Sequence, residues 1–358
     1  MTTIADVARR ANVSAMTVSR VINDTAAVND ATRQRVLSAM EELNYVPNSI
    51  ARSLISGKTN TIGLVLADLA NPFFTTIARG AEDTAHLHRH RLIICNHDDD
   101  ASKEREYIDA LISARVDGMI IVPASDASRD SLQQLACHHI PYVMLDRLVA
   151  GIQADHIIGD NRNAAYRLTS HLIDQGHKHI AIINGPQQIY TAHERFQGYV
   201  AALTDHNVPV RQGLIKEASF GPYTSRTQED AQGISGIMHD WMQGDAIRPT
   251  ALVAANNMVA IEVLHSLETM HLRCPNDVAL VCFEDIDPHG LLRPSVTAAT
   301  QPAYEYGHFA MKMLFERLTN PDCAVQSLIL RSEIHYRNSS LASYNALYME
   351  DKTSEIRA

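Results

Sequence analysis

Polar and aromatic side chains recur directly after short apolar runs in this sequence. The aromatic rings could stack on the faces of a small ring, while guanidinium, carboxylate and amide groups could hydrogen-bond its hydroxyls. That combination of side chains is typical of a carbohydrate site. The residues with this placement are Asn71, Phe73, Phe74, Asp146, Arg147, Asp160, Asn161, Arg195, Phe220, Tyr223, Asn256, Asn257, Glu284, Asp285 and Gln301.

The elements that must position these residues begin at Thr61. From there, apolar runs of strand length alternate with helical patterns. This alternation predicts parallel sheets covered by helices on both faces. In such sheets, ligands bind outside the carboxyl ends of the strands. The strands fall into two sets with a late return through residues 295–331, so we predict two doubly wound subdomains with the chain crossing between them.

The start of the chain has a different pattern. Residues 4–23 predict two short helices joined by a tight turn, because apolar residues recur at helical spacing on either side of Asn12. Asn12 tolerates the left-handed conformation of a sharp helix exit, and Ser14 is a good N-cap for a helix that begins at Ala15. Two helices joined in this way place a reading helix in the DNA major groove.

A third helix is predicted from Asp30 to Leu43. Its inward residues are expected to be Val36, Leu37, Met40 and Leu43, and they join Val13, Val18 and Val21 in the core of this N-terminal module. Residues 1–60 have a net charge of +2 and the remainder −12, although the whole chain has −10. A weakly positive module on an acidic body indicates DNA binding that depends on geometry, on pairing of two modules and on salt.

The segments DVARRANVSAMTVSRVIN, NDATRQRVLSAMEELNYVPN and ARSLISGKT resemble the DNA-binding headpiece and hinge of the LacI/GalR family of bacterial transcription regulators. The resemblance extends through almost the whole chain and fades after about Asn338. Two departures stand out. Asn12 stands where the family usually has Gly, and Glu284 stands where it more often has Asp, whose shorter side chain leaves a differently shaped pocket.

The resemblance implies that residues 15–21 enter a major groove, with Arg20 as a bidentate donor to guanine. Ala15 and Met16 occupy positions that vary with operator sequence, and as apolar residues they favour thymine methyl groups. Contacts to phosphate are implied for Thr3, Ser14, Thr17, Asn23, Tyr45 and Asn48. Such contacts set the register of the protein on DNA and do not read its sequence.

The segment 48–56 is too short to form a stable helix alone. In the family it is a hinge that orders on DNA, with a leucine wedged into the minor groove. The match of Ala51, Arg52 and Leu54 favours Leu54 as that wedge, which would require a paired protein to hold the bend. Packing of Leu54 on the body is the alternative.

The resemblance also implies which strand-end residues contact an effector: Asn71, Phe73, Phe74, Asp146, Arg147, Arg195, Asn256, Glu284 and Gln301. Phe220 is included as a further candidate. For Asp160 and Asn161, ligand contact and a role in holding the crossover are equally supported. The alternative for Arg195 is a structural ion pair. Asn257, Asp285 and Tyr223 are expected to support the contacts.

The predicted organisation is an all-α helix-turn-helix headpiece followed by a body similar to periplasmic sugar-binding proteins. The expected boundaries are 1–46 for the headpiece, 47–60 for the hinge, 61–340 for the effector-binding and dimerisation body, and 341–358 for a tail. Within the body, the first subdomain is expected at 61–160 and 291–322, and the second at 161–290 and 323–340. The tail lacks a leucine heptad, so a dimer is expected.

Other functional classes lack support in the sequence. Five scattered cysteines, without a C-x-x-C pair, fit reduced thiols in a cytoplasm. Apolar runs of membrane-spanning length, a signal peptide and the common catalytic and nucleotide-binding motifs do not occur. His86, His88, His90, His138 and His139 lack partners at metal-ligand spacing and are interpreted as surface residues.

Together these patterns predict a cytoplasmic, dimeric regulator, most simply a repressor, of a pseudo-palindromic operator. An activator or a corepressor-dependent regulator is the alternative. The expected partners are double-stranded DNA, a second copy of the chain, and a sugar, sugar acid or sugar phosphate as effector. Catalysis, a metal, a cofactor and a membrane are not expected.

Overall fold

The computed structural model describes residues 2–23, 28–46, 58–218, 228–244 and 247–341, with the side chains of Asn23 and of residues 228–232 left out. The chain divides into two compact units, residues 1–59 and 60–358, and each is described by itself. Among the described residues, none of the helices is both long and apolar enough to cross a membrane.

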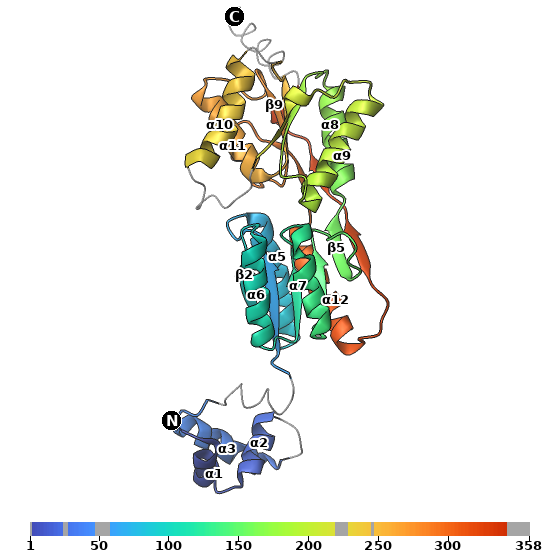
Figure 1. Ribbon diagram of the computed structural model, residues 1–358. Helices are drawn as coiled ribbons and strands as arrows, with labels where there is room; N and C mark the ends of the chain where they lie inside the picture. Colours follow the sequence, from blue (N-terminus) through green and yellow to red (C-terminus); the bar gives the residue numbers. More distant parts are fainter. Residues whose placement is uncertain (1, 24–27, 47–57, 219–227, 245–246, 342–358) are drawn as a thin grey trace, which may run out of the picture. The chain divides into compact units, whose positions relative to one another are not determined.

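The first unit has helices α1 (Ile4–Ala11), α2 (Ala15–Asn23) and α3 (Asp30–Glu42) (Figure 1). Thr3 caps α1, and its hydroxyl exchanges hydrogen bonds with Asp6. Asn12 ends the helix at φ 52°, and the Thr17 N–H donates to Ser14 Oγ at 3.1 Å. The left-handed turn at Asn12 and the N-cap at Ser14 are therefore confirmed.

These three helices enclose a small apolar core. Val7, Val18 and Val36 are fully buried in it, and Val13 is packed against its edge. Leu37 is 45% exposed, so its predicted inward position is wrong. Ala39 takes that place, because residues three and four apart on a helix share a face and position 37 turns away from the face of Val36 and Met40.

The second unit contains two six-stranded sheets. The first has the order β11-β5-β4-β3-β1-β2, and all its neighbouring strands are parallel. Its strands are β1 (Thr61–Leu66), β2 (Arg91–Asn96), β3 (Gly118–Ile121), β4 (Tyr142–Leu145), β5 (Asp155–Gly159) and β11 (Ser327–Leu330). Helices α5 (Pro72–Leu87) and α12 (Ala303–Thr319) cover one face, while α6 (Ala101–Ser113) and α7 (Arg129–Cys137) cover the other. We call this the first subdomain.

The second sheet has the order β12-β10-β9-β8-β6-β7 and is parallel except at β12. Its strands are β6 (Ile180–Asn184), β7 (Ile215–Glu217), β8 (Ala251–Ala254), β9 (Ala279–Phe283), β10 (Thr297–Thr300) and β12 (Glu333–His335). Helices α8 (Asn161–Asp174) and α9 (Tyr190–Asp205) cover one face, while α10 (Gln228–Gln243) and α11 (Asn257–Thr269) cover the other. This is the second subdomain.

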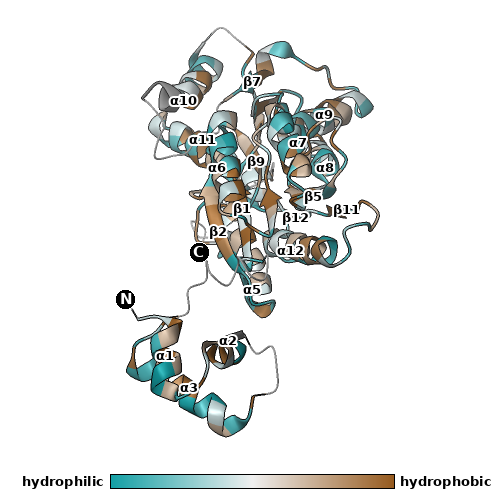
Figure 2. Cartoon of the chain, turned by 60° about the horizontal axis from the view of Figure 1, so that its bottom comes forward, coloured by the Kyte–Doolittle hydropathy of each residue, from teal (hydrophilic) through white to brown (hydrophobic). Residues whose placement is uncertain are grey.

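The central strands are apolar on both faces, and their continuous hydrophobic runs follow from burial under helices on either side. In Figure 2 the apolar residues gather on the strands and the hydrophilic ones on the outer turns of the helices. Short 3₁₀ turns at Asp126–Ser128, Gln212–Leu214 and Asn338–Ser340 complete the described elements. The predicted pair of parallel, helix-covered subdomains is confirmed.

The late return of the chain differs from its expected path. Residues 291–322 were expected in the first subdomain, but β10 pairs with β9 in the second. Residues 323–340 were expected in the second, but β11 pairs with β5 in the first. The chain therefore crosses three times, because Val296 and Ala298 are buried in the core of the second sheet while Leu328 and Leu330 pack on that of the first. The short strand β12 was not predicted.

Helices α5 and α12 pack closely because glycines face each other between them. A Cβ at Gly307 would overlap the carbonyl oxygen of Ile77, and one at Gly80 would overlap that of Tyr304. We expect Gly307→Ala to force these helices apart and to lower the free energy of unfolding by about 1–3 kcal/mol. Chemical denaturation measures this value.

Gly236→Ala is the matched control, since a Cβ there meets nothing within 4 Å on helix α10. It should leave stability unchanged or raise it, because alanine favours helix. Equal stability of Gly307→Ala and the wild type would contradict the close packing.

Candidate functional site

The first candidate surface is helix α2 of the N-terminal unit. Arg20 is exposed and makes no hydrogen bond or ion pair with the described residues, and Met16 is 64% exposed beside it. Ala15 is exposed as well, whereas Val18 and Val21 face the core. The residues predicted to read bases therefore share the solvent side of one short helix.

The residues that were predicted to contact phosphate take part in contacts within the N-terminal unit. The hydroxyls of Thr3 and Ser14 cap α1 and α2, and the Ser14 and Thr17 hydroxyls lie 2.9 Å apart. Tyr45 is half-buried against the headpiece core. The described part of the chain does not include the side chain of Asn23 or the residues Asn48, Ala51, Arg52 and Leu54. The predicted hinge therefore falls largely on residues that the structure does not describe.

The second candidate is a cavity of about 50 Å³ that residues of both subdomains line. Eight of the predicted effector residues line it: Asn71, Phe73, Phe74, Asp146, Arg147, Arg195, Asn256 and Glu284. They follow β1, β4, β6, β8 and β9, so the expectation that they lie together at strand ends agrees with the geometry. Asp68, Asp99, Thr191 and Met258 also line the cavity and were not predicted.

Two carboxyl groups occupy equivalent places in the two subdomains. Asp146 follows β4 at φ 64°, and its N–H donates to Ile157 O at 2.8 Å. Glu284 follows β9 at φ 63°, and its N–H donates to Ala299 O at 3.0 Å. This left-handed backbone conformation costs free energy for a non-glycine residue, and residues strained in this way cluster at functional sites. In both cases it ends the strand and places the residue at the cavity.

Both carboxyl groups are buried and incompletely hydrogen-bonded. Asp146 Oδ1 and Glu284 Oε1 have no hydrogen-bond partner among the described residues. Burial raises the pKa of Asp146, although Arg147 and Arg195 oppose the shift. Burial likewise raises the pKa of Glu284 to about 8 against the attraction of Arg195, and the Asp146 charge adds to the rise. These oxygens are therefore positioned to meet donors that the protein does not supply.

The two arginines are held by protein acceptors. Arg147 Nη1 donates to Asp99 Oδ1 at 2.6 Å and to the carbonyls of Pro123 and Ala124. Arg195 Nε donates to Asn161 Oδ1 at 2.8 Å, and its Nη1 donates to Ala255 O. The Arg195 guanidinium also lies 4.1 Å from the centroid of the Phe283 ring. Arg195 thus lies at the cavity and is also held in place by hydrogen bonds. The ion pair considered as its alternative role is not found among the described residues.

A direct hydrogen bond joins the two subdomains at this cavity. Asn257 Nδ2, at the start of α11, donates to Asn71 Oδ1 at 3.0 Å. Asn71 and Asn256 also cap α5 and α11. The volume is far below the several hundred Å³ of ordinary ligand pockets, so a sugar requires the cleft to widen.

Two predicted effector residues are instead used at the crossovers. Asp160 Oδ1 accepts from the Ser332 N–H at 2.8 Å and from its hydroxyl at 2.7 Å, and Asp160 does not line the cavity. Gln301 accepts from the Tyr306 hydroxyl at 2.5 Å and does not line it either. For Asp160 the crossover role is the one the contacts support, because Asp160 and Ser332 lie on two crossing segments. Phe220 and Tyr223 are outside the described residues.

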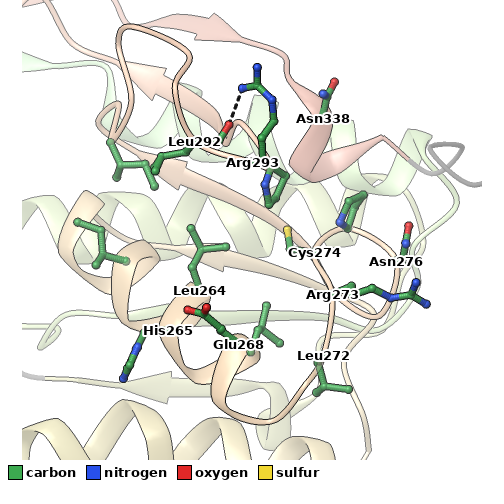
Figure 3. A pocket seen from close by; sticks show the side chains of 15 residues that line it. Leu264, His265, Glu268, Leu272, Arg273, Cys274, Asn276, Leu292, Arg293 and Asn338 are labelled. Carbon is green, nitrogen blue, oxygen red and sulfur yellow. Dashed lines mark hydrogen bonds between the residues drawn. The ribbon is translucent and has the colours of Figure 1, made fainter. Parts of the chain in front are cut away.

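A larger cavity of about 690 Å³ lies within the second subdomain (Figure 3). Leu264 and Leu267 of α11, Leu272, Ile286 and Leu292 give it a largely apolar lining. It contains none of the predicted effector residues. Its chemistry suits an apolar partner, so the smaller, polar cavity is the better candidate for a hydroxyl-rich effector.

The raised pKa of Glu284 predicts a pH-dependent stability. Between its ordinary pKa of 4.5 and about 8, the unfolded chain loses this proton while the folded chain keeps it. Stability is therefore lost as the pH rises, by about 1.4 kcal/mol for each unit of pKa difference. Glu284→Gln removes this loss, so its melting temperature relative to wild type should be several degrees higher at pH 8 than at pH 5.

The control is Glu106→Gln, which changes an exposed glutamate of α6. Its melting temperature should follow the wild type across the same pH range in scanning calorimetry. A constant difference between Glu284→Gln and wild type from pH 5 to 8 would show that Glu284 ionises normally.

Comparisons with known proteins agree with this architecture. A family described as "Bacterial regulatory proteins, lacI family" matches residues 3–48, and "Periplasmic binding protein-like domain" matches residues 169–340. The HTH-type transcriptional repressor PurR of Aliivibrio fischeri (strain MJ11) is 33% identical over 342 residues, which cover 95% of this chain and 99% of that protein.

Solved structures show the same likeness. A lac repressor dimer bound to operator and the anti-inducer ONPF has a TM-score of 0.82 at 25% identity, covering 95% of this chain and 99% of that one. A CelR–cellobiose complex has a TM-score of 0.68 at 27% identity, covering 95% and 100%. This chain belongs to the lacI family of bacterial regulatory proteins, and as such it is a DNA-binding, repressor-like transcription regulator and not an enzyme.

Proposed function

We propose that this protein represses transcription by binding a pseudo-palindromic operator as a homodimer, and that a sugar or sugar derivative in the cleft between its subdomains changes its affinity for DNA. The observation that carries the proposal is the joining of a helix-turn-helix unit to a body whose polar cleft is lined from both subdomains. The likeness to the lac repressor and to the CelR–cellobiose complex supports both parts.

The DNA-binding part of the proposal rests on α2. Arg20 presents a planar fork that matches the two acceptors of guanine in the major groove. Ala15 and Met16, on the same exposed side, suit thymine methyl groups. Thr3, Ser14, Thr17 and Tyr45 would meet phosphate from the helix starts and the end of the third helix. Asn23, Asn48 and the Ala51–Leu54 hinge complete the proposed contacts by sequence.

The dimer is supported by exposed apolar surface of the body. Strand β2 is the edge of the first sheet, and its Ile93 and Ile94 are 40% and 43% exposed. Ile261 and Leu292 are similarly exposed at the apolar cavity of the second subdomain (Figure 3). An exposed sheet edge can pair with another chain, and exposed apolar patches can mark sites of protein–protein contact. A second copy would cover both and would pair the two headpieces.

The effector would act through the geometry of the cleft. A ligand that contacts Asp146 and Arg147 on one side and Arg195 and Glu284 on the other favours one arrangement of the subdomains over another. In a dimer, this rearrangement changes the separation of the two N-terminal units. A coupling of about 1–3 kcal/mol would give a 5- to 150-fold change in operator affinity.

Replacing the proposed base contact tests the DNA-binding assignment. Arg20→Ala should reduce the preference for operator over random duplex by the roughly 1–3 kcal/mol of one bidentate contact, while the response of the body to effector remains. Competition binding measures the ratio of the two affinities. Arg10→Ala, which breaks an exposed pair with Glu42, is the control and should keep the ratio. Unchanged specificity in Arg20→Ala would discard the reading-helix assignment.

Replacing the cleft arginine tests the effector assignment. Arg195→Ala should keep basal operator binding and lose the change caused by effector, because the groups around Asn161 and Ala255 are no longer held. Arg195→Lys keeps the charge without the fork and should also lose most of the response.

Arg105→Ala, an exposed arginine paired with Asp130, is the matched control for both. Circular dichroism establishes that each variant is folded. A full effector response in folded Arg195→Ala would place the effector elsewhere.

A further inference from the structure

The apolar cavity of the second subdomain has no role in the proposed function beyond the contribution of Ile261 and Leu292 to the dimer. Its volume of about 690 Å³ is within the roughly 300–1,000 Å³ of ordinary ligand pockets, so it can hold several side chains. Leu264 and Leu267 of α11 and Leu272 after it give much of its apolar lining. Apolar surface of this kind can mark a site of contact with another segment of protein.

The two sides of this cavity have different neighbours. Leu292, which the second copy would cover in the proposed dimer, lies on the same side as His265 (Figure 3). Arg273, Asn276 and Asn338 lie on the other side. The dimer contact proposed above does not include that second side, which therefore needs a different occupant.

The chain itself leads away from this second side of the cavity. Asn338 lines the cavity and begins the 3₁₀ turn Asn338–Ser340. The Cys274 thiol, which also lines the cavity, donates to Ser339 O at 3.6 Å and holds the turn beside it. Leu341 follows the turn and is the last residue that the structure describes. Whatever follows Leu341 therefore starts next to the cavity.

The C-terminal segment, residues 342–358, follows this turn and lies outside the described part of the chain. Its sequence divides into an apolar half, which ends at Met349, and a charged half. In the apolar half, Tyr344, Leu347 and Tyr348 recur at the spacing of one helix face. The half that comes first after the cavity is therefore the one whose side chains suit an apolar lining.

The charges at the cavity agree with the same assignment. Arg273 and Arg293 line the cavity together with Glu268. The Arg273 side chain is 72% exposed, and Arg293 donates to two backbone carbonyls without a carboxylate partner among the described residues. Glu350 and Asp351 open the charged half and would bring two carboxylates to these guanidinium groups. Exposed ion pairs contribute little to stability, so the apolar contacts would provide most of the binding.

We propose that the apolar half of the C-terminal segment docks into this cavity of its own chain and covers the side that the dimer leaves uncovered. The occupant is the same chain because the tether from Leu341 is short, and a short tether gives a high effective concentration. Docking would stabilise the second subdomain and close the cavity to other apolar molecules. The segment begins after residue 340, where the match to the periplasmic binding protein-like family ends, so docking would be a property of this chain.

Cross-linking locates the C-terminal segment directly in the full-length protein. Asn276→Cys places a thiol on the exposed rim of the cavity, Ala346→Cys places one in the apolar half, and Cys137→Ser removes an exposed native thiol. We expect a disulfide within one chain, identified by peptide mapping and by a monomer mass on a non-reducing gel. The matched control adds Leu347→Asp, which keeps the tether and should slow disulfide formation at least about tenfold, because the docked leucine is lost.

Two results of this experiment would overturn the proposal. A disulfide between two chains would show that the C-terminal segment docks on the second copy. Equal rates of disulfide formation with and without Leu347→Asp would show that the apolar half does not dock.

Removal of residues 342–358 tests the effect on the cavity. The shortened protein should unfold at a lower temperature in scanning calorimetry. It should also bind the apolar dye anilinonaphthalene sulfonate several times more tightly, since a docked segment leaves the cavity free for only a fraction of the time. Ile356→Asp is the control, because it changes an apolar residue of the charged half and should match the wild type in both measurements.

An unfolding temperature and a dye affinity equal to those of the full-length chain would contradict docking. If the shortened protein also becomes a monomer in analytical ultracentrifugation, the segment acts between copies, and docking within one chain is wrong. None of these measurements uses DNA or an effector, so their outcome is independent of the proposed operator and effector binding.

Discussion

The buried side-chain amide of Asn161 connects the candidate cleft, through hydrogen bonds, to the segments where the chain crosses between the subdomains. Asn161 Oδ1 accepts from Arg195 Nε at 2.8 Å and lies 3.4 Å from Gln301 Nε2, while Gln301 accepts from Tyr306. Asn161 follows the first segment that crosses between the subdomains, and Gln301 lies in the second. The cleft residue Arg195 is therefore held by the same segments about which the subdomains would move. A buried network of this kind is effective only when its members are satisfied together.

The third crossover is secured in the same manner. Ser332 donates twice to Asp160, and Arg337 pairs with Asp285 directly after β9. Since Asp285 follows Glu284, this ion pair also fixes the strand end that presents Glu284 to the cavity. Polar residues near the strand ends therefore divide into two groups. One group lines the cleft, and the other holds the crossing segments so that the first group keeps its geometry.

Local features of the sequence predicted much of this structure correctly. Asn12 and Ser14 specify the turn between α1 and α2, because the left-handed conformation and the N-cap are properties of single residues. Continuous apolar runs predicted buried parallel strands, and parallel strands bring their carboxyl ends to one edge. That geometry is why residues as distant as Asn71, Arg195 and Glu284 line the same cavity. The headpiece pattern, long and specific, indicated the family before any contact was known.

Tertiary contacts decided the rest. Asp160 and Gln301 have the same chemistry and strand-end placement as the cleft residues. Their partners Ser332 and Asn161, however, lie on other crossing segments, which the sequence pattern does not bring together. The exchange of β10 and β11 between sheets likewise depends on which core their side chains complete. By itself the sequence determined the helix caps, the types of most strands and helices and the N-terminal helix-turn-helix. Which polar groups remain without partners at the cleft was determined only by folding, because hydrogen-bond satisfaction depends on groups far apart in the chain.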